Sequence, residues 1–304
     1  MNRPEIILVG ASGDLGGRIL KALVARGASV RALVRVSASQ QDKDRLARLG
    51  ARVIPADETN VDSLAPSLAG ADCVVSALNG LHEVIVDRQR VLLDAAVKAR
   101  VPRFISSDYS ADFTKTRPGD NRNFDLRREF MAIADQAPIR VTSILNGAFL
   151  DMLGAEMPII QSGIRRVLYW GDAGQLLDFT TKDNVASYVA AAALDDTTPR
   201  ILRIAGDSVS ARTIAQAMSA VAGKRFRTLR AGGIVSLGLL IRVAKLVAPQ
   251  PRAAFPPWQG MRYMRDMFSG RGKLDPLDND RYPDIRWTSV GEHLAPTNWR
   301  RVTP

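Results

Sequence analysis

The sequence predicts an α/β fold, with a doubly wound parallel sheet and a smaller C-terminal α+β lobe. One reason is that residues 1–155 alternate short apolar segments with segments of helical periodicity, joined by short connections. The other reason is size, because 304 residues with 46% hydrophobic content suffice for one large domain and a small lobe. The charged content of 24% is ordinary for a folded chain and excludes wholesale disorder.

A strand, a glycine-rich turn and a helix open the chain. The apolar segment 5–9 is long enough for a buried parallel strand, and Gly10, Gly13 and Gly16 follow it directly. Leucine and isoleucine then recur at helical spacing up to Gly27. In this context the first glycine permits a tight turn, the second lets backbone amides approach a pyrophosphate, and the third lets the helix pack on the strand. The motif therefore predicts that a dinucleotide binds at the start of this helix.

The second expected strand, 30–35, ends in a cation. Folds that bind NAD typically carry an acidic residue about 20 positions after the glycines, because it accepts hydrogen bonds from the ribose. Here Arg35 occupies that place, nineteen residues after Gly16. A guanidinium pairs with a 2′-phosphate, which a carboxylate would repel. We therefore predict NADP(H) rather than NAD(H).

The alternation of strands and helices continues to residue 145. We expect strands at 51–55, 72–77, 103–106 and 139–145, and helices at 60–69, 84–99 and 123–136. Ligands of such sheets bind beyond the carboxyl ends of the strands. The candidate cofactor residues at these ends are Ala77, Leu78, Asn79, Ser106, Asn146 and Phe149.

Neither a metal site nor a disulfide is expected. Cys73 is the single cysteine and falls inside an expected strand, so we interpret it as a small core residue. His82 and His293 lie far apart and have no metal-ligand spacing. The N-terminal apolar run is too short for a signal peptide, so we expect a reducing cytoplasm.

Several segments together resemble a known family. In chain order they are GASGDLGGRI, ALVRVSAS, GARVIPAD, ADCVVSAL, LLDAAVKARVPRFISSDYS and RYPDIRWTSVGEHL, from Gly10 to about Leu294. They are similar to the NmrA-like branch of atypical short-chain dehydrogenases/reductases, and within it to isoflavone reductases and phenylcoumaran benzylic ether reductases. The glycine motif is shared by many families, whereas the LVR strand end and YPDIRWTSV are more specific.

The resemblance implies a Rossmann domain, a smaller substrate lobe and NADP(H) as the cofactor. It implies that the catalytic members transfer a hydride from the nicotinamide to a small aromatic substrate, and we extend this expectation to enones and quinones. The cofactor residues expected in the first strand, turn and helix are Gly10, Ser12, Gly13, Asp14, Leu15 and Gly16, together with Arg35 at the end of the second strand.

One family residue is missing, which leaves a second function open. The reductases place a lysine three residues after a phenylalanine in the helix before the sixth strand, and counted from Phe124 this position holds Arg127. A guanidinium stays protonated and is a poor acid. A Tyr-x-x-x-Lys pair is absent as well, since Phe113 stands four residues after Tyr109. The alternative is an NADP(H)-sensing regulatory protein that binds a protein partner, as some NmrA-like proteins do.

Three residues are candidates for the catalytic role. Tyr109 stands at a strand end, where a phenol is a plausible proton donor. Lys115 lies nearby on a polar loop, and Arg127 is a candidate for stabilising an oxyanion without proton transfer. For each of them, the residues alone favour a structural interpretation, as a packed phenol, a solvated ammonium and an ion-paired guanidinium respectively.

The second half of the chain is expected to return once to the sheet. Residues 165–179 predict a hairpin with its turn at Gly171–Gly174. Thr181 or Asp183 then caps a helix over 184–194. A strand at 200–204 and a helix at 211–222 follow. The expected organisation is a cofactor domain over 1–155 joined by 175–210, and a substrate lobe of 156–174 and 211–304.

The formal net charge of +11 is confined to the C-terminal third. Residues 200–304 contain 18 basic and 7 acidic residues, whereas 1–199 contain 24 of each, and no acidic residue lies between Asp207 and Asp266. No nucleic-acid module accompanies this charge, so a nucleic-acid partner is not expected. The apolar segment 234–247 is too short to span a bilayer.

The segment 234–247 has a clear helical face, formed by Ile234, Leu237, Ile241 and Ala244. We favour packing of this face against the substrate cleft or against a second subunit in a homodimer. Binding to an anionic membrane surface is the less favoured alternative.

Overall fold

The computed structural model describes residues 3–154 and 157–295. The chain forms two compact units. The first unit consists of Met1–Tyr109, Leu126–Ile144 and Val185–Leu202, and the second of Ser110–Asp125, Leu145–Asn184 and Arg203–Pro304. The expected division differs from this one, because residues 110–125, 145–154, 175–184 and 203–210, all expected in the cofactor domain, belong to the second unit.

A seven-stranded sheet forms the centre of the first unit, in the order β11-β6-β5-β4-β1-β2-β3. Its strands are β1 (Glu5–Val9), β2 (Ser29–Arg35), β3 (Arg52–Ala56), β4 (Cys73–Ser76), β5 (Arg103–Ser106), β6 (Arg140–Leu145) and β11 (Ile201–Arg203). Neighbouring strands from β3 to β6 pair in parallel. The strand order reverses between β1 and β4, which is where ligands of doubly wound sheets bind. The predicted fold class is confirmed.

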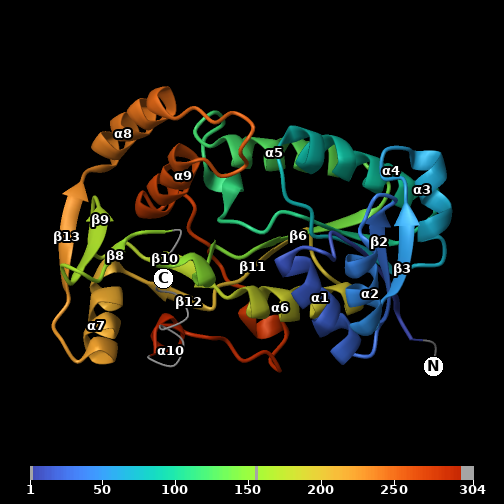
Figure 1. The fold of residues 1–304 in the computed structure, drawn as a ribbon, viewed down its shortest axis with the longest axis horizontal. Helices are drawn as coiled ribbons and strands as arrows, with labels where there is room; N and C mark the ends of the chain where they lie inside the picture. Colours follow the sequence, from blue (N-terminus) through green and yellow to red (C-terminus); the bar gives the residue numbers. More distant parts are fainter. Residues whose placement is uncertain (1–2, 155–156, 296–304) are drawn as a thin grey trace. The chain divides into compact units, whose positions relative to one another are not determined.

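Helices cover both faces of this sheet, with α3, α4 and α5 on one face and α1, α2 and α6 on the other (Figure 1). Their bounds are α1 (Asp14–Ala25), α2 (Gln40–Arg48), α3 (Val61–Leu68), α4 (Gln89–Lys98), α5 (Arg122–Ala134) and α6 (Lys182–Leu194). The helix expected at 84–99 is two segments, because a π-helical turn at Glu83–Arg88 precedes α4. Side chains of the sheet such as Ile7 and Phe104 are fully buried, and the Phe104 ring lies 6.3 Å from that of Phe130 on α5.

The second unit contains two three-stranded sheets, β12-β10-β7 and β13-β9-β8. Their strands are β7 (Ala148–Phe149), β8 (Ile160–Gln161), β9 (Arg166–Trp170), β10 (Leu177–Thr180), β12 (Asp207–Val209) and β13 (Arg227–Gly232). The helices are α7 (Ala211–Ala222), α8 (Ile234–Val247), α9 (Pro257–Phe268) and α10 (Val290–His293). Short 3-10 helices lie at Phe113–Lys115, Leu150–Met152 and Asn279–Arg281. The bounds of α7 match the predicted ones, and α8 covers the segment singled out in the sequence.

The hairpin predicted at 165–179 is wrong. A turn is present, since the amide of Gly174 donates to Asp172 Oδ1 over 2.8 Å. However, β9 pairs with β8 and β13, while β10 pairs with β7 and β12. After β9 the amide of Gly171 donates to the carbonyl of Gly232, so the chain continues along β13 rather than folding back against β9. Of the two predicted helix caps, Thr181 is confirmed, because its Oγ1 accepts from the amide of Asn184 over 3.1 Å.

Candidate cofactor and active site

Close backbone contacts require two of the three glycines in the first turn. Gly10 adopts a φ of +83°, and a Cβ there would lie 2.5 Å from the carbonyl oxygen of Ala77. A Cβ on Gly16 would lie 2.1 Å from the carbonyl oxygen of Gly10. Both distances are far below van der Waals contact, and both neighbours are backbone atoms that cannot move aside. These glycines therefore let β1, β4 and α1 approach one another.

The fold does not require the middle glycine, Gly13. It is the N-cap of α1 with an ordinary φ of −74°, and a Cβ there would meet only the carbonyl oxygen of Gly10 at 3.4 Å. No side chain caps α1, and Ser12, Gly13 and Asp14 are exposed, while Leu15 is half-buried. An uncapped helix start with exposed amides is suited to an anion that approaches the backbone. The Asp14 carboxylate beside it is paired with Arg18 at 2.8 Å.

Two arginines stand at the edge of this turn. Arg35 ends β2 and is exposed, and its side chain makes no hydrogen bond or ion pair with the residues that the structure describes. Arg45 on α2 donates from Nη2 to the carbonyl oxygen of Ser12 over 2.8 Å. Sequence reasoning missed Arg45, because this contact joins residues 33 positions apart and no local pattern indicates it. The arrangement leaves Arg35 available for an external anion and fixes Arg45 against the turn.

The residues after β4 border the same end of the sheet. Ala77 and Leu78 are half-buried and Asn79 is exposed. The hydroxyl of Ser107 donates to the carbonyl oxygen of Leu78 over 2.6 Å, and the amide of Ser107 donates to Gln89 Oε1 over 2.8 Å. The fully buried Gln89, which sequence reasoning also missed, therefore ties the segments after β4 and β5 to the start of α4.

Ser106 belongs to a buried polar cluster at the ends of β5 and β6. Its hydroxyl donates to Asp108 Oδ2 over 2.5 Å, and the Ser143 hydroxyl donates to the same oxygen over 2.7 Å. Arg200 Nη1 donates to the Ser143 hydroxyl over 2.8 Å. The Ser106 side chain is thus directed into the fold, where it positions the segment that leads to Tyr109.

Tyr109 is buried, and its phenol is engaged. The hydroxyl donates to the carbonyl oxygen of Ser76, the last residue of β4, over 3.0 Å. Burial, and to a smaller extent the neighbouring Asp108, strongly raises the pKa of the Tyr109 phenol, so it stays protonated at any physiological pH. The contact fixes the segment after β5 to the end of β4, beside the glycine turn.

We expect Tyr109→Phe to lower the free energy of unfolding by about 1 kcal/mol, because the Ser76 carbonyl loses a buried donor. Tyr169→Phe is the matched control, since the half-buried Tyr169 makes no hydrogen bond through its hydroxyl to a described residue. Urea unfolding of both variants measures the difference. An equal, negligible effect of both substitutions would mean that the contact with Ser76 contributes nothing to stability.

The other two catalytic candidates lie in different units. Lys115, in the second unit, donates to the carbonyl oxygens of Lys273 and Asp275 over 3.2 and 3.0 Å, and its Nζ lies 3.6 Å from Asp112. Its ammonium is thus bound within that unit. Arg127, in the first unit, lies on α5 and is buried, with 7% of its surface exposed.

Asn146 is the polar residue of the second unit that most clearly indicates a ligand. It is fully buried, and its backbone carbonyl accepts from Thr180 Oγ1 over 2.7 Å. Neither its side-chain oxygen nor its side-chain nitrogen has a hydrogen-bond partner among the described residues. A buried amide without partners is costly, by about 1–3 kcal/mol, and such groups are rare outside functional sites. Phe149 follows on β7, half-buried, with Lys182 Nζ 6.0 Å from its ring centroid.

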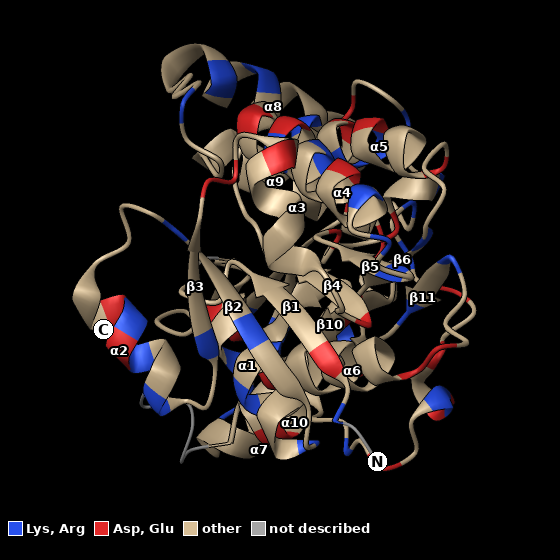
Figure 2. Cartoon of the chain, turned by 90° about the vertical axis from the view of Figure 1, so that its right-hand side faces the viewer, with Lys and Arg blue, Asp and Glu red and all other residues tan. Residues whose placement is uncertain are grey.

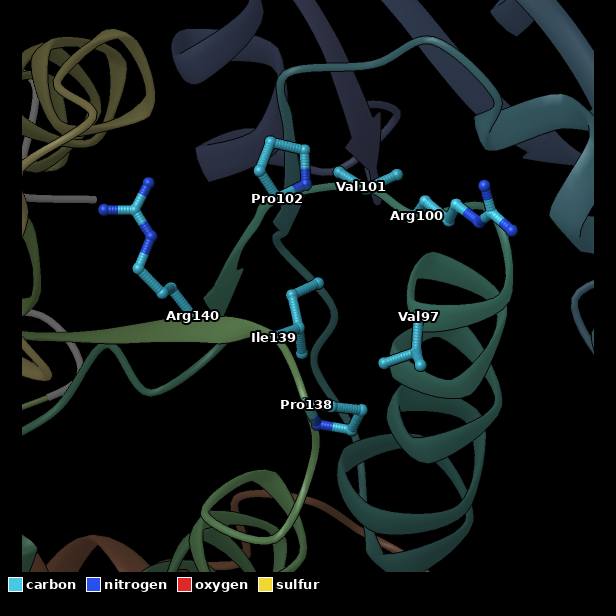
Figure 3. Close-up of a pocket in the computed structure, with 7 residues that line it drawn as sticks. All are labelled: Val97, Arg100, Val101, Pro102, Pro138, Ile139 and Arg140. Atoms are coloured by element: carbon cyan, nitrogen blue, oxygen red, sulfur yellow. The ribbon is translucent and has the colours of Figure 1, made fainter.

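A pocket of about 630 Å³ in the first unit lies elsewhere. It is lined by residues 97, 100–102 and 138–140, at the amino ends of β5 and β6 (Figure 3). The guanidinium groups of Arg100 and Arg140 point away from each other rather than into a common space. Because the glycine turn lies at the carboxyl end of β1, this pocket is at the opposite edge of the sheet and is not the candidate site.

His82 lies outside the cofactor region and forms an exposed charge cluster. Its Nε2 is 3.0 Å from Glu129 Oε1, and its Nδ1 is 3.2 Å from Asp87 Oδ2. These hydrogen bonds, first the one with Glu129, raise the pKa of His82 above its ordinary value of about 6.5.

The raised pKa makes the stabilisation by His82 dependent on pH. The contribution is fully present below about pH 6.5, where the histidine is charged even in the unfolded chain, and is lost as the pH rises through the raised pKa of the folded state. We expect His82→Gln to be less stable than the wild type at pH 5.5, by less than about 1 kcal/mol because the pair is exposed, and equally stable at pH 9. Thermal unfolding at both values tests this. His293 is present in both proteins, so its titration cancels.

The single cysteine is part of the core of the first unit. Cys73 is buried in β4, where burial raises the pKa of its thiol to about 12, consistent with an inert core residue. No group of three or more His, Cys, Asp or Glu side chains in residues 3–154 and 157–295 is arranged to hold a metal ion. Within the same residues, every helix is too short or too polar to cross a bilayer.

A sequence model of the NmrA-like family matches residues 2–241. The chain belongs to this family. Pinoresinol reductase 1 of Arabidopsis thaliana is 26% identical to this NmrA-like protein over 204 residues, which cover 62% of the chain and 64% of that reductase. The match thus spans less than two thirds of that relative's length.

Solved structures of related proteins share the fold of this NmrA-like chain. A structure described as AtPrR2 with NADP+ and (+)pinoresinol superposes with a TM-score of 0.81 at 21% identity, covering 97% of this chain and 98% of that one. A leucoanthocyanidin reductase–NADPH complex from Vitis vinifera gives a TM-score of 0.77 at 14% identity, covering 95% and 97%. The predicted family and the predicted Rossmann-type fold are confirmed.

Proposed function

We propose that this NmrA-like protein is an NADPH-dependent reductase that transfers a hydride to a small aromatic, enone or quinone-like substrate. The observation that carries the proposal is the first turn, in which the fold does not require Gly13 and Arg35 lacks a partner among the described residues. The names of its relatives support it, because they include a pinoresinol reductase and structures with NADP+ or NADPH.

The residues at the carboxyl end of the sheet fit this cofactor. The uncapped amides at the start of α1 receive the pyrophosphate, and Gly13 leaves them accessible. Arg35 pairs with the 2′-phosphate. Ala77, Leu78 and Asn79 border the cofactor at the end of β4. NADPH, when bound, supplies a hydride from its nicotinamide and leaves as NADP+, while the reduced substrate takes up one proton.

The residues of this chain are proposed to stabilise charge on the substrate and to position the reacting groups. We assign to Arg127 the stabilisation of the negative charge that develops on the substrate, because a guanidinium keeps its positive charge. Tyr109 and Lys115 remain candidates for the proton donor, although the partners of both groups favour positioning roles. The buried side-chain amide of Asn146 is proposed to bind the nicotinamide or the substrate.

The turn provides a direct test of cofactor binding. We expect Gly13→Ala to keep the stability of the wild type, because the nearest atom to a Cβ is 3.4 Å away, but to weaken NADPH binding about tenfold by obstructing the pyrophosphate. Calorimetric titration with NADPH measures the affinity. Gly17→Ala is the control, since the nearest neighbour of its Cβ would be the carbonyl oxygen of Ala11 at 3.6 Å and Gly17 lies inside α1. Equal affinity of both variants and the wild type would refute the proposed role of the turn.

The alternative is a regulatory protein, and the arginine at the position of the family lysine favours it. Measured turnover of NADPH distinguishes the reductase from this alternative. Oxidation of NADPH is followed by the loss of its absorbance in the presence of each member of a panel of quinones, enones and aromatic ethers. Steady turnover with any member supports the reductase. If NADPH binds but no member is reduced, and a protein partner is captured only when NADP(H) is present, the protein is a sensor instead.

A further inference from the structure

The helix α8 has two apolar faces, and only one of them is covered. Leu237 and Ile241 are buried, and Ile234 packs against the core of the second unit, as the face predicted from the sequence requires. On the opposite side, six large apolar side chains are exposed, each with 50% to 82% of its surface accessible. They are Val235, Leu239, Leu240, Val243, Leu246 and Val247. We call these six side chains the outer face of α8.

The outer face is the main concentration of exposed apolar surface in the described part of the chain. Seven of the twelve large apolar side chains that are exposed there lie between Val235 and Phe255. Isolated exposed apolar residues are ordinary, whereas a contiguous patch marks an interaction surface. The helix has 14 residues and is therefore about 21 Å long, and the patch extends along one side of it.

The segment of the second unit that contains α8 is rich in positive charge. Residues 208–265 contain ten Lys and Arg and no Asp or Glu. Exposed arginines lie just before and at the start of β13, at Arg225 and Arg227, near its end at Arg230, and within α8 at Arg242. In Figure 2 the ribbon of α8 accordingly carries basic but no acidic positions. A second copy of this chain would bring the same positive charge against itself, whereas an anionic surface complements it.

A further group of cations lies where α8 meets α9. Arg122, Lys245 and Arg262 lie 5.0, 5.5 and 5.2 Å from the ring centroid of Trp258. None of these three cations forms an ion pair with a carboxylate of the described residues. The Trp258 ring holds these cations within the unit, and Arg262 also interacts electrostatically with Asp125 and Asp266, so the charge available to a partner is mainly that of the exposed arginines.

We propose that the outer face of α8 binds the surface of an anionic membrane. The helix lies in the plane of the interface, with its six apolar side chains among the upper acyl chains and the flanking arginines on lipid phosphates. Its length and the packing of Leu237 and Ile241 against its own unit agree with an interfacial rather than a spanning helix. This inference does not depend on the proposed reductase activity.

Vesicle flotation of the full chain tests the proposal. The wild type is expected to float with vesicles of phosphatidylglycerol and phosphatidylcholine and to remain unbound with phosphatidylcholine alone. Val243→Glu with Leu246→Glu is expected to abolish binding, and Arg230→Ser with Arg242→Ser to weaken it by about tenfold or more at low salt. Leu277→Glu is the control, because Leu277 is 41% exposed in the same unit and the amide of the next residue, Asp278, donates to the carbonyl of Arg203 at the end of β11 rather than to β13 or α8.

Three outcomes would overturn the proposal. The first is no flotation of the wild type with anionic vesicles, and the second is equal flotation with neutral ones. The third is a wild-type dimer in sedimentation that Val243→Glu with Leu246→Glu converts into a monomer, which would identify the outer face as a subunit interface. Circular dichroism and NADPH titration of each variant show that it is folded, since none of these positions belongs to the cofactor site.

Discussion

Gly16→Ala is expected to lower the free energy of unfolding by about 3 kcal/mol and to abolish binding of the dinucleotide. The added Cβ would lie 2.1 Å from the carbonyl oxygen of Gly10 and 2.7 Å from its carbonyl carbon. Both are backbone atoms of the turn between β1 and α1, so relief requires the start of the helix to move away from the strand. That movement displaces the amides that are proposed to hold the pyrophosphate. Urea unfolding and NADPH titration measure the two effects.

The next residue along the helix provides the control. A Cβ on Gly17 would lie 3.6 Å from the carbonyl oxygen of Ala11, which is ordinary contact. Because alanine is the better helix former, Gly17→Ala is expected to be neutral or to stabilise by up to about 1 kcal/mol. If Gly16→Ala binds NADPH with the affinity of the wild type, the turn is not the cradle of the cofactor, whatever the substitution does to stability.

The first unit was predictable because its signals are local. Each strand of the seven-stranded sheet lies within one residue of the predicted bounds at both ends. The reason is that a short apolar run followed by a turn is typical of a buried parallel strand. The glycine turn could be predicted as well, because the strand, the glycines and the helix are consecutive in the sequence. Arg35 was found by its distance along the chain from these glycines.

What the sequence could not supply depends on long-range pairing. The segment 165–179 carries the pattern of a hairpin, but β9 and β10 find their partners in separate sheets. Likewise, the bond from Tyr109 to Ser76 joins residues 33 positions apart. The partners of Lys115 are the carbonyls of Lys273 and Asp275, far along the chain. No period in the sequence encodes such contacts, so the three catalytic candidates could be named but not ranked.

The helix α8 shows the same limit from another side. The periodicity predicts that Ile234, Leu237, Ile241 and Ala244 form the face that packs. The structure buries Leu237 and Ile241 and leaves Ile234 and Ala244 half-buried. The pattern could not show that the opposite face remains exposed, because nearly every position of the segment is apolar. A helix that is covered on both sides and a helix that is covered on one side can have the same apolar pattern. They are distinguished only by the accessible surface of each side chain in the structure.

Arg35→Glu is expected to reverse the preference of the site between the two dinucleotides. Charge-assisted hydrogen bonds contribute about 1.5–3 kcal/mol, so loss of the guanidinium alone weakens NADPH binding by about 10- to 100-fold. The new carboxylate repels the 2′-phosphate but accepts from the ribose hydroxyls of NADH. We therefore expect the ratio of the two affinities to shift by at least about two orders of magnitude toward NADH, measured by titrating the variant with each cofactor.

The stability of the fold is expected to be unchanged, because Arg35 is exposed and makes no bond with the described residues that the substitution would break. Lys21→Glu is the matched control: it reverses one exposed charge on α1 and changes the net charge equally, without standing at the end of β2. If both variants weaken NADPH binding to the same extent, the effect is a long-range one of net charge. A loss confined to Arg35→Glu, together with a gain for NADH, identifies direct contact between the guanidinium and the 2′-phosphate, since long-range repulsion alone would not improve the binding of NADH.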